Sequence, residues 1–317
     1  MLRKRVIDTH CDTLMYYARD YSVFKDGEVD VTYDKMGGYE TYLGTFAMYF
    51  DAKLEQAERL KIAEKYLAAY AHMLKSYDIK RVLTAADLAA LTGRGALLSI
   101  ENACFFEDDA ADLAKYWAAG VRMLSMTHFL NSQFGCGNAA GDTPDDDTGL
   151  TRRGRAFIPM VEKCGMVLDV SHLSFQSFWD VCEVASKPFI ASHSNAYAKR
   201  GHNRNLKDDM FLELVRRGGL AGLCFCPAFI SYSEDETAGI DDVVDHAEHL
   251  LGLGGEKTLC IGGDFDGVDH HVTGLENCSC TWNLVEAMLR RGWSEGLVED
   301  IMWGNAYRFL MKMLPEV

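Results

Sequence analysis

The sequence predicts a single-domain α/β protein, folded over residues 1–317 as one (β/α)8, or TIM, barrel. Eight short apolar segments recur along the chain, segments of helical periodicity lie between them, and most of the apolar segments are continuous rather than alternating. Continuous apolar runs are typical of parallel strands that helices cover on both faces. Eight strands alternating with helices favour a closed barrel over an open sheet. No G-x-G-x-x-G motif follows the first strand, so the sequence does not support a nucleotide-binding sheet.

The predicted strands are short apolar runs, such as Met166-Val167-Leu168, that turn residues or polar residues bound. Their spacing leaves room for a helix between most neighbours, as a parallel barrel requires. In chain order we expect strands at residues 5–10, 43–50, 96–101, 121–127, 165–171, 188–193, 220–225 and 258–264.

The predicted helices are segments in which apolar residues recur at helical spacing. Gly120, Gly165 and Gly218 follow three of them, where a helix is expected to end before the next strand begins. In chain order we expect helices at residues 56–76, 109–119, 154–163, 175–185, 208–217, 241–251 and 295–313.

The charge balance excludes one class of partner. The chain has 47 acidic and 32 basic residues, a formal net charge of −15. A nucleic-acid-binding protein is expected to carry a basic surface, so we expect no nucleic-acid partner. No window approaches 18 consecutive apolar residues, so we expect no membrane span.

The ten cysteines and the N-terminus predict a cytoplasmic location. The positively charged start is followed by no apolar stretch, so we expect no signal peptide. In a chain of this length without an export signal, reduced thiols are expected rather than disulfides. Cys224-x-Cys226 and Cys278-x-Cys280 lack the C-x-x-C spacing of zinc or redox motifs, and we expect them to act as small buried apolar residues.

Residues that can bind metal or transfer protons close six of the eight predicted strands. The carboxyl ends of all strands in such a barrel meet at one mouth, and imidazole and carboxylate are ligands that Zn²⁺ prefers. One histidine at a strand end is commonly a structural residue, but their recurrence predicts a shared site. The residues are His10, Asp12, Glu101, His128, His172, His193 and Asp264.

The spacing of these residues predicts two zinc ions per chain. Residues i and i+2 of a strand point the same way, so His10 and Asp12 can hold one ion. Glu101 can bridge both ions with its two oxygens, and His172 and His193 can complete the second ion. Five ligands exceed the four of one tetrahedral zinc, and a hydroxide shared between the ions would be the nucleophile. Four further histidines are expected to be solvated or structural: His246, His249, His270 and His271.

Six motifs in this sequence resemble those of the renal, or membrane, dipeptidases, which are amidohydrolase-like zinc enzymes on a (β/α)8 barrel. The resemblance runs from about residue 6 to about residue 310, with the motifs in the order found in that family. The motifs are I-D-T-H-C-D at 7–12, T-H-F-x-N at 127–131, G-M-V-L-D-V-S-H-L-S at 165–174, S-H-S-N-A at 192–196, N-R-N-L-x-D at 203–208 and G-G-D-F-D-G at 262–267.

The resemblance implies a role for each site residue. It implies that His10 and Asp12 bind the first zinc, that Glu101 bridges, and that His172 and His193 bind the second. It further implies that His128 contacts the scissile group, that Arg204 holds the terminal carboxylate of the substrate, and that Asp264 transfers protons. We place Asn131 of the second motif among the substrate contacts.

Two departures from the family accompany the resemblance. The bridging glutamate usually precedes Gly, whereas Asn102 follows Glu101 here, and we expect this replacement to change the floor of the pocket. The animal members carry a signal peptide, an anchor site and disulfides, which we do not identify here. A cytoplasmic, bacterial-type member is therefore the better comparison.

The sequence thus predicts a zinc-dependent dipeptidase, with alternatives left open. The substrate is expected to be a small dipeptide, including those with a D-residue at the C-terminus, and a homodimer is compatible with the sequence. One alternative is another amidohydrolase-type reaction on the same dinuclear site, such as lactone, amide or phosphoester hydrolysis. No predicted strand ends in the lysine that many such relatives carboxylate. Another alternative is a metal-binding protein without catalysis.

Two residue assignments also have structural alternatives. Asp264 could be a buried carboxylate that caps a loop, or a further zinc ligand, instead of a proton carrier. Arg204 could form a surface salt bridge with Asp208 or Asp209 instead of binding a substrate carboxylate.

Overall fold

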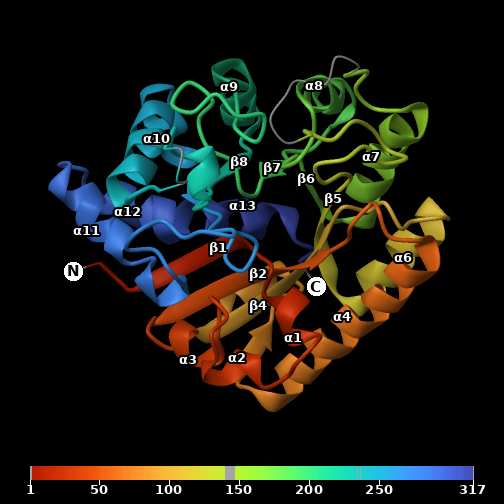
Figure 1. Cartoon of the computed structure of the whole chain (residues 1–317), viewed down its shortest axis with the longest axis horizontal. Coiled ribbons are helices and arrows are strands. Elements are labelled where there is room, and N and C mark those ends of the chain that lie inside the picture. Colours follow the sequence, from red (N-terminus) through yellow and green to blue (C-terminus); the bar gives the residue numbers. More distant parts are fainter. Residues whose placement is uncertain (1, 140–146, 234, 236, 317) are drawn as a thin grey trace.

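A closed parallel barrel with helices around it forms the body of the protein (Figure 1). The computed structural model describes residues 2–139, 147–233, 235 and 237–316. The strands in the described residues are β1 (Arg5–Cys11), β2 (Thr41–Tyr49), β3 (Ile79–Arg81), β4 (Gly93–Glu101), β5 (Val121–Ser125), β6 (Val167–Asp169), β7 (Ile190–Ala191), β8 (Leu220–Leu223) and β9 (Leu259–Ile261).

Eight of these strands close the ring, which confirms the predicted fold. The order runs β2-β1-β9-β8-β7-β6-β5-β4, and β2 also pairs with β4 in parallel. The short strand β3 pairs with the first half of β4, on the edge that β5 occupies further along. The sequence did not predict β3, because two of its three residues are exposed and charged and it contains no apolar run.

The helices cover the outside of the ring (Figure 1). They are α1 (Thr13–Tyr17), α2 (Val23–Asp26), α3 (Tyr33–Met36), α4 (Gln56–Ser76), α5 (Ala85–Ala89), α6 (Asp109–Ala119), α7 (Arg152–Cys164), α8 (Phe175–Val184), α9 (Asp208–Arg217), α10 (Ile240–Gly252), α11 (Asn283–Arg290), α12 (Glu295–Glu299) and α13 (Asn305–Met313).

Three helix ends confirm the glycine signals. Gly120, Gly165 and Gly218 cap α6, α7 and α9 in the left-handed conformation, which a residue without a Cβ adopts at little cost. Within the described ranges, no helix has the combination of length and apolar character that a transmembrane span needs.

The predicted helical segment at residues 295–313 is confirmed, with one irregularity in its middle. It consists of α12, a π-helical turn at Asp300–Gly304, and α13. The carboxamide of Asn305, directly after that turn, donates to the carbonyl oxygens of Glu256 and Leu259, each at 2.8 Å. Helical periodicity alone cannot reveal a turn that aligns a side chain with a strand distant in sequence.

The inside of the barrel is apolar at the end where the strands begin. Each of the eight barrel strands contributes one buried side chain to a cluster. Helix α13 packs against this cluster and closes this end of the barrel. The polar mouth must therefore lie at the opposite end, where the strands finish. The eight strand residues are Ile7, Leu43, Leu97, Met123, Val167, Ile190, Leu220 and Cys260.

The barrel wall is tightly packed around the carbonyl oxygen of Ser192. The hydroxyl of Thr9 donates to this oxygen at 2.6 Å. Gly222 of β8 and Gly262, directly after β9, lie so close that a Cβ atom would come within 1.9 Å and 1.8 Å of it, respectively. Only residues without a side chain fit at these two positions.

We predict that Gly222→Ala lowers the free energy of unfolding by about 3 kcal/mol, because the added methyl group must displace backbone rather than a flexible side chain. The matched control is Gly252→Ala at the end of α10, where nothing lies within 4 Å of the added Cβ. There we expect a gain of up to about 1 kcal/mol. Urea unfolding midpoints give both values, and equal midpoints for the two variants would contradict the close approach at Ser192.

Candidate active site

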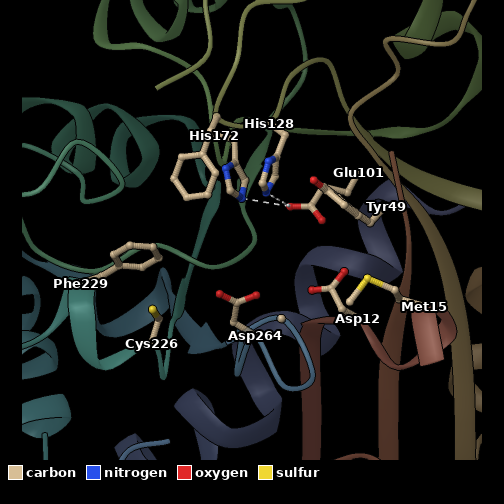
Figure 2. A pocket seen from close by; sticks show the side chains of 11 residues that line it. Asp12, Met15, Tyr49, Glu101, His128, His172, Cys226, Phe229 and Asp264 are labelled. Atoms are coloured by element: carbon tan, nitrogen blue, oxygen red, sulfur yellow. Dashed lines mark ion pairs between the residues drawn. The ribbon is translucent and has the colours of Figure 1, made fainter. Parts of the chain in front are cut away.

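Polar side chains from the ends of the barrel strands converge on one cavity of about 220 Å³. Figure 2 shows Glu101, His128 and His172 on one side of this cavity and Asp12 and Asp264 opposite them. The cavity thus lies where parallel strands end, at the usual position of a barrel active site. Its lining residues are Asp12, Met15, Tyr49, Glu101, His128, Phe129, His172, Cys226, Phe229, Asp264 and Gly267.

The two carboxylate oxygens of Glu101 face two different histidine groups. Oε2 lies 3.6 Å from Nε2 of His10. Oε1 lies 3.0 Å from Nε2 of His172 and 3.7 Å from Nε2 of His193. A carboxylate placed in this way can offer one oxygen to each of two ions.

The ring orientations divide the histidines into the same two groups. The in-plane lone pairs of stacked rings run side by side and do not meet at one ion. His10 stacks on His193, with ring centres 3.9 Å apart and an angle of 24°. His172 and His193 instead lie at 55°, with their Nε2 atoms 2.9 Å apart. His128 stacks on His172 at 4.1 Å and 30°, although its Nε2 is also within 3.9 Å of Glu101.

Asp12 lies beside His10 but not on the strand. It directly follows β1 as the residue that precedes α1, so the expected strand spacing of i and i+2 does not apply. Its Oδ2 still lies 3.2 Å from Nε2 of His10, and its Oδ1 is buried without a hydrogen-bond partner. An orphaned carboxylate oxygen beside an imidazole fits a cation between them.

Burial and charge at the site also fit a cation. Burial raises the pKa of the Glu101 carboxyl well above its usual value, and the neighbouring charge of Asp12 adds to this shift. Burial alone would lower the pKa of His10, but Glu101 and Asp12 outweigh it and raise the pKa to about 10. The raised pKa of a buried imidazole beside carboxylates reflects an excess of negative charge, which a bound cation would balance.

The other ring donors are neutral. Burial, and then the positive charge of Arg204, lower the pKa of His172 well below its usual value. Burial, followed by His10, does the same for the pKa of His193. Neutral imidazoles keep a lone pair for a metal ion. The donor set therefore fits two zinc ions, and the assignment of individual ligands stays a prediction.

Several site residues adopt a backbone conformation that side chains disfavour. His172, Asp264 and Asn102 have φ angles of 69°, 59° and 69°. Such left-handed residues are uncommon outside glycine and are found preferentially at functional sites. The convergence of these side chains is therefore accompanied by local backbone strain.

Asn102 corrects one expectation. Its left-handed backbone explains why glycine suits this position, and asparagine tolerates the same conformation. Its carboxamide donates to the carbonyl oxygen of Phe50 at 2.8 Å, and the residue is not among those that line the cavity. The replacement therefore places no side chain in the lining of the cavity, and the predicted change of the pocket floor finds no support in the lining residues.

Asp264 lines the cavity beside His10. Its Oδ1 is 3.8 Å from Nε2 of His10, and its Oδ2 accepts a hydrogen bond from the thiol of Cys224 at 3.4 Å. Burial raises the pKa of this carboxyl above its usual value. A cavity-lining carboxyl group of raised pKa can both accept and return a proton.

His128 is the most open of the site histidines. Its side chain is 22% exposed, against 4% or less for His10, His172 and His193. Burial, and then the charge of Arg204, lower its pKa to about 3, so the ring is neutral. It lies in the cavity wall, where a neutral imidazole can donate a hydrogen bond to a ligand.

Arg204 is buried beside His193. It is 2% exposed, its Nη2 donates to the carbonyl oxygen of His193 at 3.0 Å, and its Nε has no partner. It forms no ion pair with any carboxylate of the described residues, so the alternative of a surface salt bridge with Asp208 or Asp209 is wrong. Its guanidinium carbon lies 5.4 Å from the ring centre of Phe229, which lines the cavity.

Asn131 is not brought to the cavity. The residue is exposed, and its Oδ1 accepts a hydrogen bond from the backbone N–H of Gly137 at 3.1 Å. In this structure its side chain orders a surface loop, and no contact with the site supports the predicted substrate role.

Three of the four histidines expected to be solvated or structural have structural partners. His246 is buried between the backbone of Ala196 and Ile230, His249 contacts Asp208, and His271 contacts Asp30. None of them belongs to a metal-compatible cluster among the described residues.

The apolar and aromatic wall of the cavity was not predicted from the sequence. This wall includes Met15, Tyr49, Phe129, Cys226 and Phe229. Tyr49 is the last residue of β2, and Cys226 follows β8 closely, so position at a strand end was the available signal. Cys226 was expected in the core and instead lies at the cavity.

Comparison with known sequences identifies relatives along nearly the whole chain. A family model described as "Membrane dipeptidase (Peptidase family M19)" matches residues 1–314. The dipeptidase tcpJ of Claviceps purpurea is 30% identical over 271 residues, which cover 84% of this chain and 62% of that protein. The chain thus spans somewhat less than two thirds of this curated relative.

Solved structures share the fold. A metallopeptidase named dipeptidase AC, of family M19, is 25% identical in sequence to this chain, and its structure matches with a TM-score of 0.90. The match covers 99% of each chain. A metallopeptidase from Rhodobacter sphaeroides, liganded with a phosphinate mimic of the dipeptide L-Ala-D-Ala, is 24% identical with a TM-score of 0.90. That match covers 99% of this chain and all of the other, and it shows the likeness of the fold.

We predict that the purified protein binds about two zinc ions per chain, because its donors exceed the four of one zinc site. Glu101→Gln should weaken the binding of both ions, since each Glu101 oxygen faces a different group of histidines. His193→Ala should leave the binding of the first ion unchanged. The control is His249→Ala on the outer helix α10, which should keep both ions. Metal analysis after zinc reconstitution provides the measurement, and at most one ion in the wild type would refute the dinuclear site.

Proposed function

This chain belongs to the membrane dipeptidase family, peptidase family M19, and on this premise we propose that it is a zinc-dependent dipeptidase. The observation that carries the proposal is Arg204, a buried guanidinium beside the histidine group, without a carboxylate partner among the described residues. A buried unpaired cation is costly. The free carboxylate of a dipeptide, one residue beyond the scissile bond, would pair with it.

Two zinc ions would be held by His10, Asp12 and Glu101 on one side and by Glu101, His172 and His193 on the other. When bound, they supply an activated water and a Lewis acid for the substrate carbonyl. The separate orientations of the two Glu101 oxygens support this arrangement.

His128 and Asp264 act on the substrate from opposite sides of the cavity (Figure 2). The neutral ring of His128 donates a hydrogen bond to the carbonyl oxygen of the scissile bond, where negative charge develops. Asp264 accepts the proton of the attacking water and returns it to the leaving amine. Its raised pKa and its hydrogen bond from Cys224 suit a group that changes its protonation during the reaction.

The proposed substrates include dipeptides with a D-residue at the C-terminus. Arg204 recognises a carboxylate, a group that L- and D-residues share, so chirality at that residue does not remove the contact. The small cavity and its apolar wall of Met15, Phe129 and Phe229 favour short substrates with side chains that can contact apolar groups.

We predict that Asp264→Asn lowers kcat by about 100-fold or more, as expected for the loss of an acid–base group. The asparagine keeps the size of the side chain, so fold and zinc content should not change. Steady-state kinetics and metal analysis on the same preparation provide the measurement. A variant that has lost zinc would show that Asp264 is mainly a ligand.

We also predict that dipeptides are hydrolysed far better than tripeptides or C-terminally amidated dipeptides, and that Arg204→Met removes this preference. The charge-assisted contact with the carboxylate contributes about 1.5–3 kcal/mol, or roughly 10- to 150-fold in kcat/KM. The substrate panel also includes a lactone and a phosphoester.

The control for this prediction is Arg216→Met, which removes an exposed arginine of α9 that pairs with Glu213 and should leave the preference unchanged. Equal kcat/KM for a dipeptide and its amide in the wild type would contradict the role of Arg204. Faster hydrolysis of the lactone or phosphoester would favour another amidohydrolase-type reaction.

A further inference from the structure

A serine and an aspartate lie behind the ring of His193, on the side away from the cavity. Nδ1 of His193 is 2.7 Å from Oγ of Ser192, and the same Oγ is 2.5 Å from Oδ2 of Asp169. All three residues are buried, with at most 5% of each exposed. Water therefore does not compete for these hydrogen bonds.

The hydrogen bonds around Asp169 set the direction of this chain. Its Oδ1 accepts the backbone N–H groups of Ser171 and Ser192, each at 3.0 Å. Its Oδ2 faces the Ser192 hydroxyl, and a carboxylate can only accept, so that hydroxyl donates to Asp169. The lone pairs of Oγ are then left for His193, whose Nδ1 must carry a hydrogen in order to donate.

A hydrogen on Nδ1 leaves the lone pair of His193 on Nε2. That atom faces Nε2 of His172 at 2.9 Å and Oε1 of Glu101 at 3.7 Å, where the second ion is proposed. The neighbouring ligand candidate has no such support, because Nδ1 of His172 is buried without a partner. Of the two histidines proposed for the second ion, His193 is thus the one whose tautomer a neighbouring side chain sets.

We propose that Asp169 and Ser192 are positioning residues that fix the tautomer of His193, and thereby the affinity of the second metal position for its ion. The proposal rests on the proposed function in that His193 is taken as a zinc ligand. Hydrogen-bonded partners behind a ligating histidine typically change metal affinity by about 10- to 100-fold.

Asp169→Asn tests the direction of the hydrogen bonds rather than their presence. The Oδ1 of the introduced asparagine can keep both backbone N–H groups, while its NH2 group replaces Oδ2 and donates to the Ser192 hydroxyl. That hydroxyl must then donate to Nδ1 of His193, which places the ring hydrogen on Nε2. We expect zinc at the second position to bind about 10- to 100-fold more weakly, with the first position unchanged, in a chelator competition.

Ser192→Ala provides a second variant that does not depend on how the introduced carboxamide of Asp169→Asn orients. Without the hydroxyl, neither tautomer of His193 is favoured by this neighbour, so we expect a smaller loss of affinity than in Asp169→Asn. The matched control is Ser99→Ala, which removes a buried barrel hydroxyl that donates only to the carbonyl oxygen of Phe46. It should leave both zinc affinities within about twofold of the wild type.

The tautomer itself gives a readout that a purely structural role would not change. In the metal-free protein, two-bond ¹H–¹⁵N spectra of the histidine rings should show His193 with its hydrogen on Nδ1 in the wild type and on Nε2 in Asp169→Asn. An unchanged tautomer in both variants, or an equal loss of zinc in Ser99→Ala, would overturn the proposal.

Failure of this inference is distinguishable from failure of the proposed function. A wild type that hydrolyses dipeptides but whose second zinc is unaffected by Asp169→Asn refutes only the role of Asp169 and Ser192. A wild type that shows the tautomer switch and the weakened second zinc, but hydrolyses no dipeptide, refutes only the dipeptidase proposal.

Discussion

Closure of the barrel is the constraint on which the candidate site depends, and the parallel ladder between β2 and β4 provides it. In the linear strand order, β1 and β4 lie near opposite ends of the sheet. The ladder runs from Thr41 opposite Gly93 to Tyr49 opposite Glu101 and joins those ends. Only in the closed ring can His10 of β1 lie 3.6 Å from the carboxylate at the end of β4. The shared carboxylate is therefore a property of the whole fold rather than of any one motif.

The two ends of the barrel have different physical characters. One end is an apolar layer to which every barrel strand contributes a side chain, closed by α13, and such burial stabilises the fold. The other end gathers buried carboxylates, neutral imidazoles and left-handed residues such as His172 and Asp264, all of which oppose stability. The apolar end offsets this cost and allows the mouth to keep a strained, charged arrangement.

Most of the fold and the centre of the candidate site could be predicted from the sequence, because both follow from local patterns. Eight apolar runs predicted the barrel strands, and the polar residues at the ends of six of them predicted the site positions, among them His10, Glu101, His172 and His193. What could not be predicted depends on contacts between distant residues. The burial of Arg204 against the carbonyl of His193 and the surface position of Asn131 are not encoded in their motifs. The support of His193 by Asp169 likewise appears only once β6 and β7 are neighbours.

The hydrogen bond from Arg204 to the main-chain carbonyl of His193 has a thermodynamic consequence. Arg204, proposed to hold the substrate carboxylate, is hydrogen-bonded to the backbone of His193, proposed to hold an ion. In the proposed arrangement, occupancy of either position would restrict the same short piece of backbone, and the two binding equilibria would be coupled through it. Linkage is reciprocal: if a bound dipeptide raises the affinity for zinc, bound zinc raises the affinity for the dipeptide by the same factor. The metal content would then depend on the substrate concentration, and the substrate affinity would depend on the metal content.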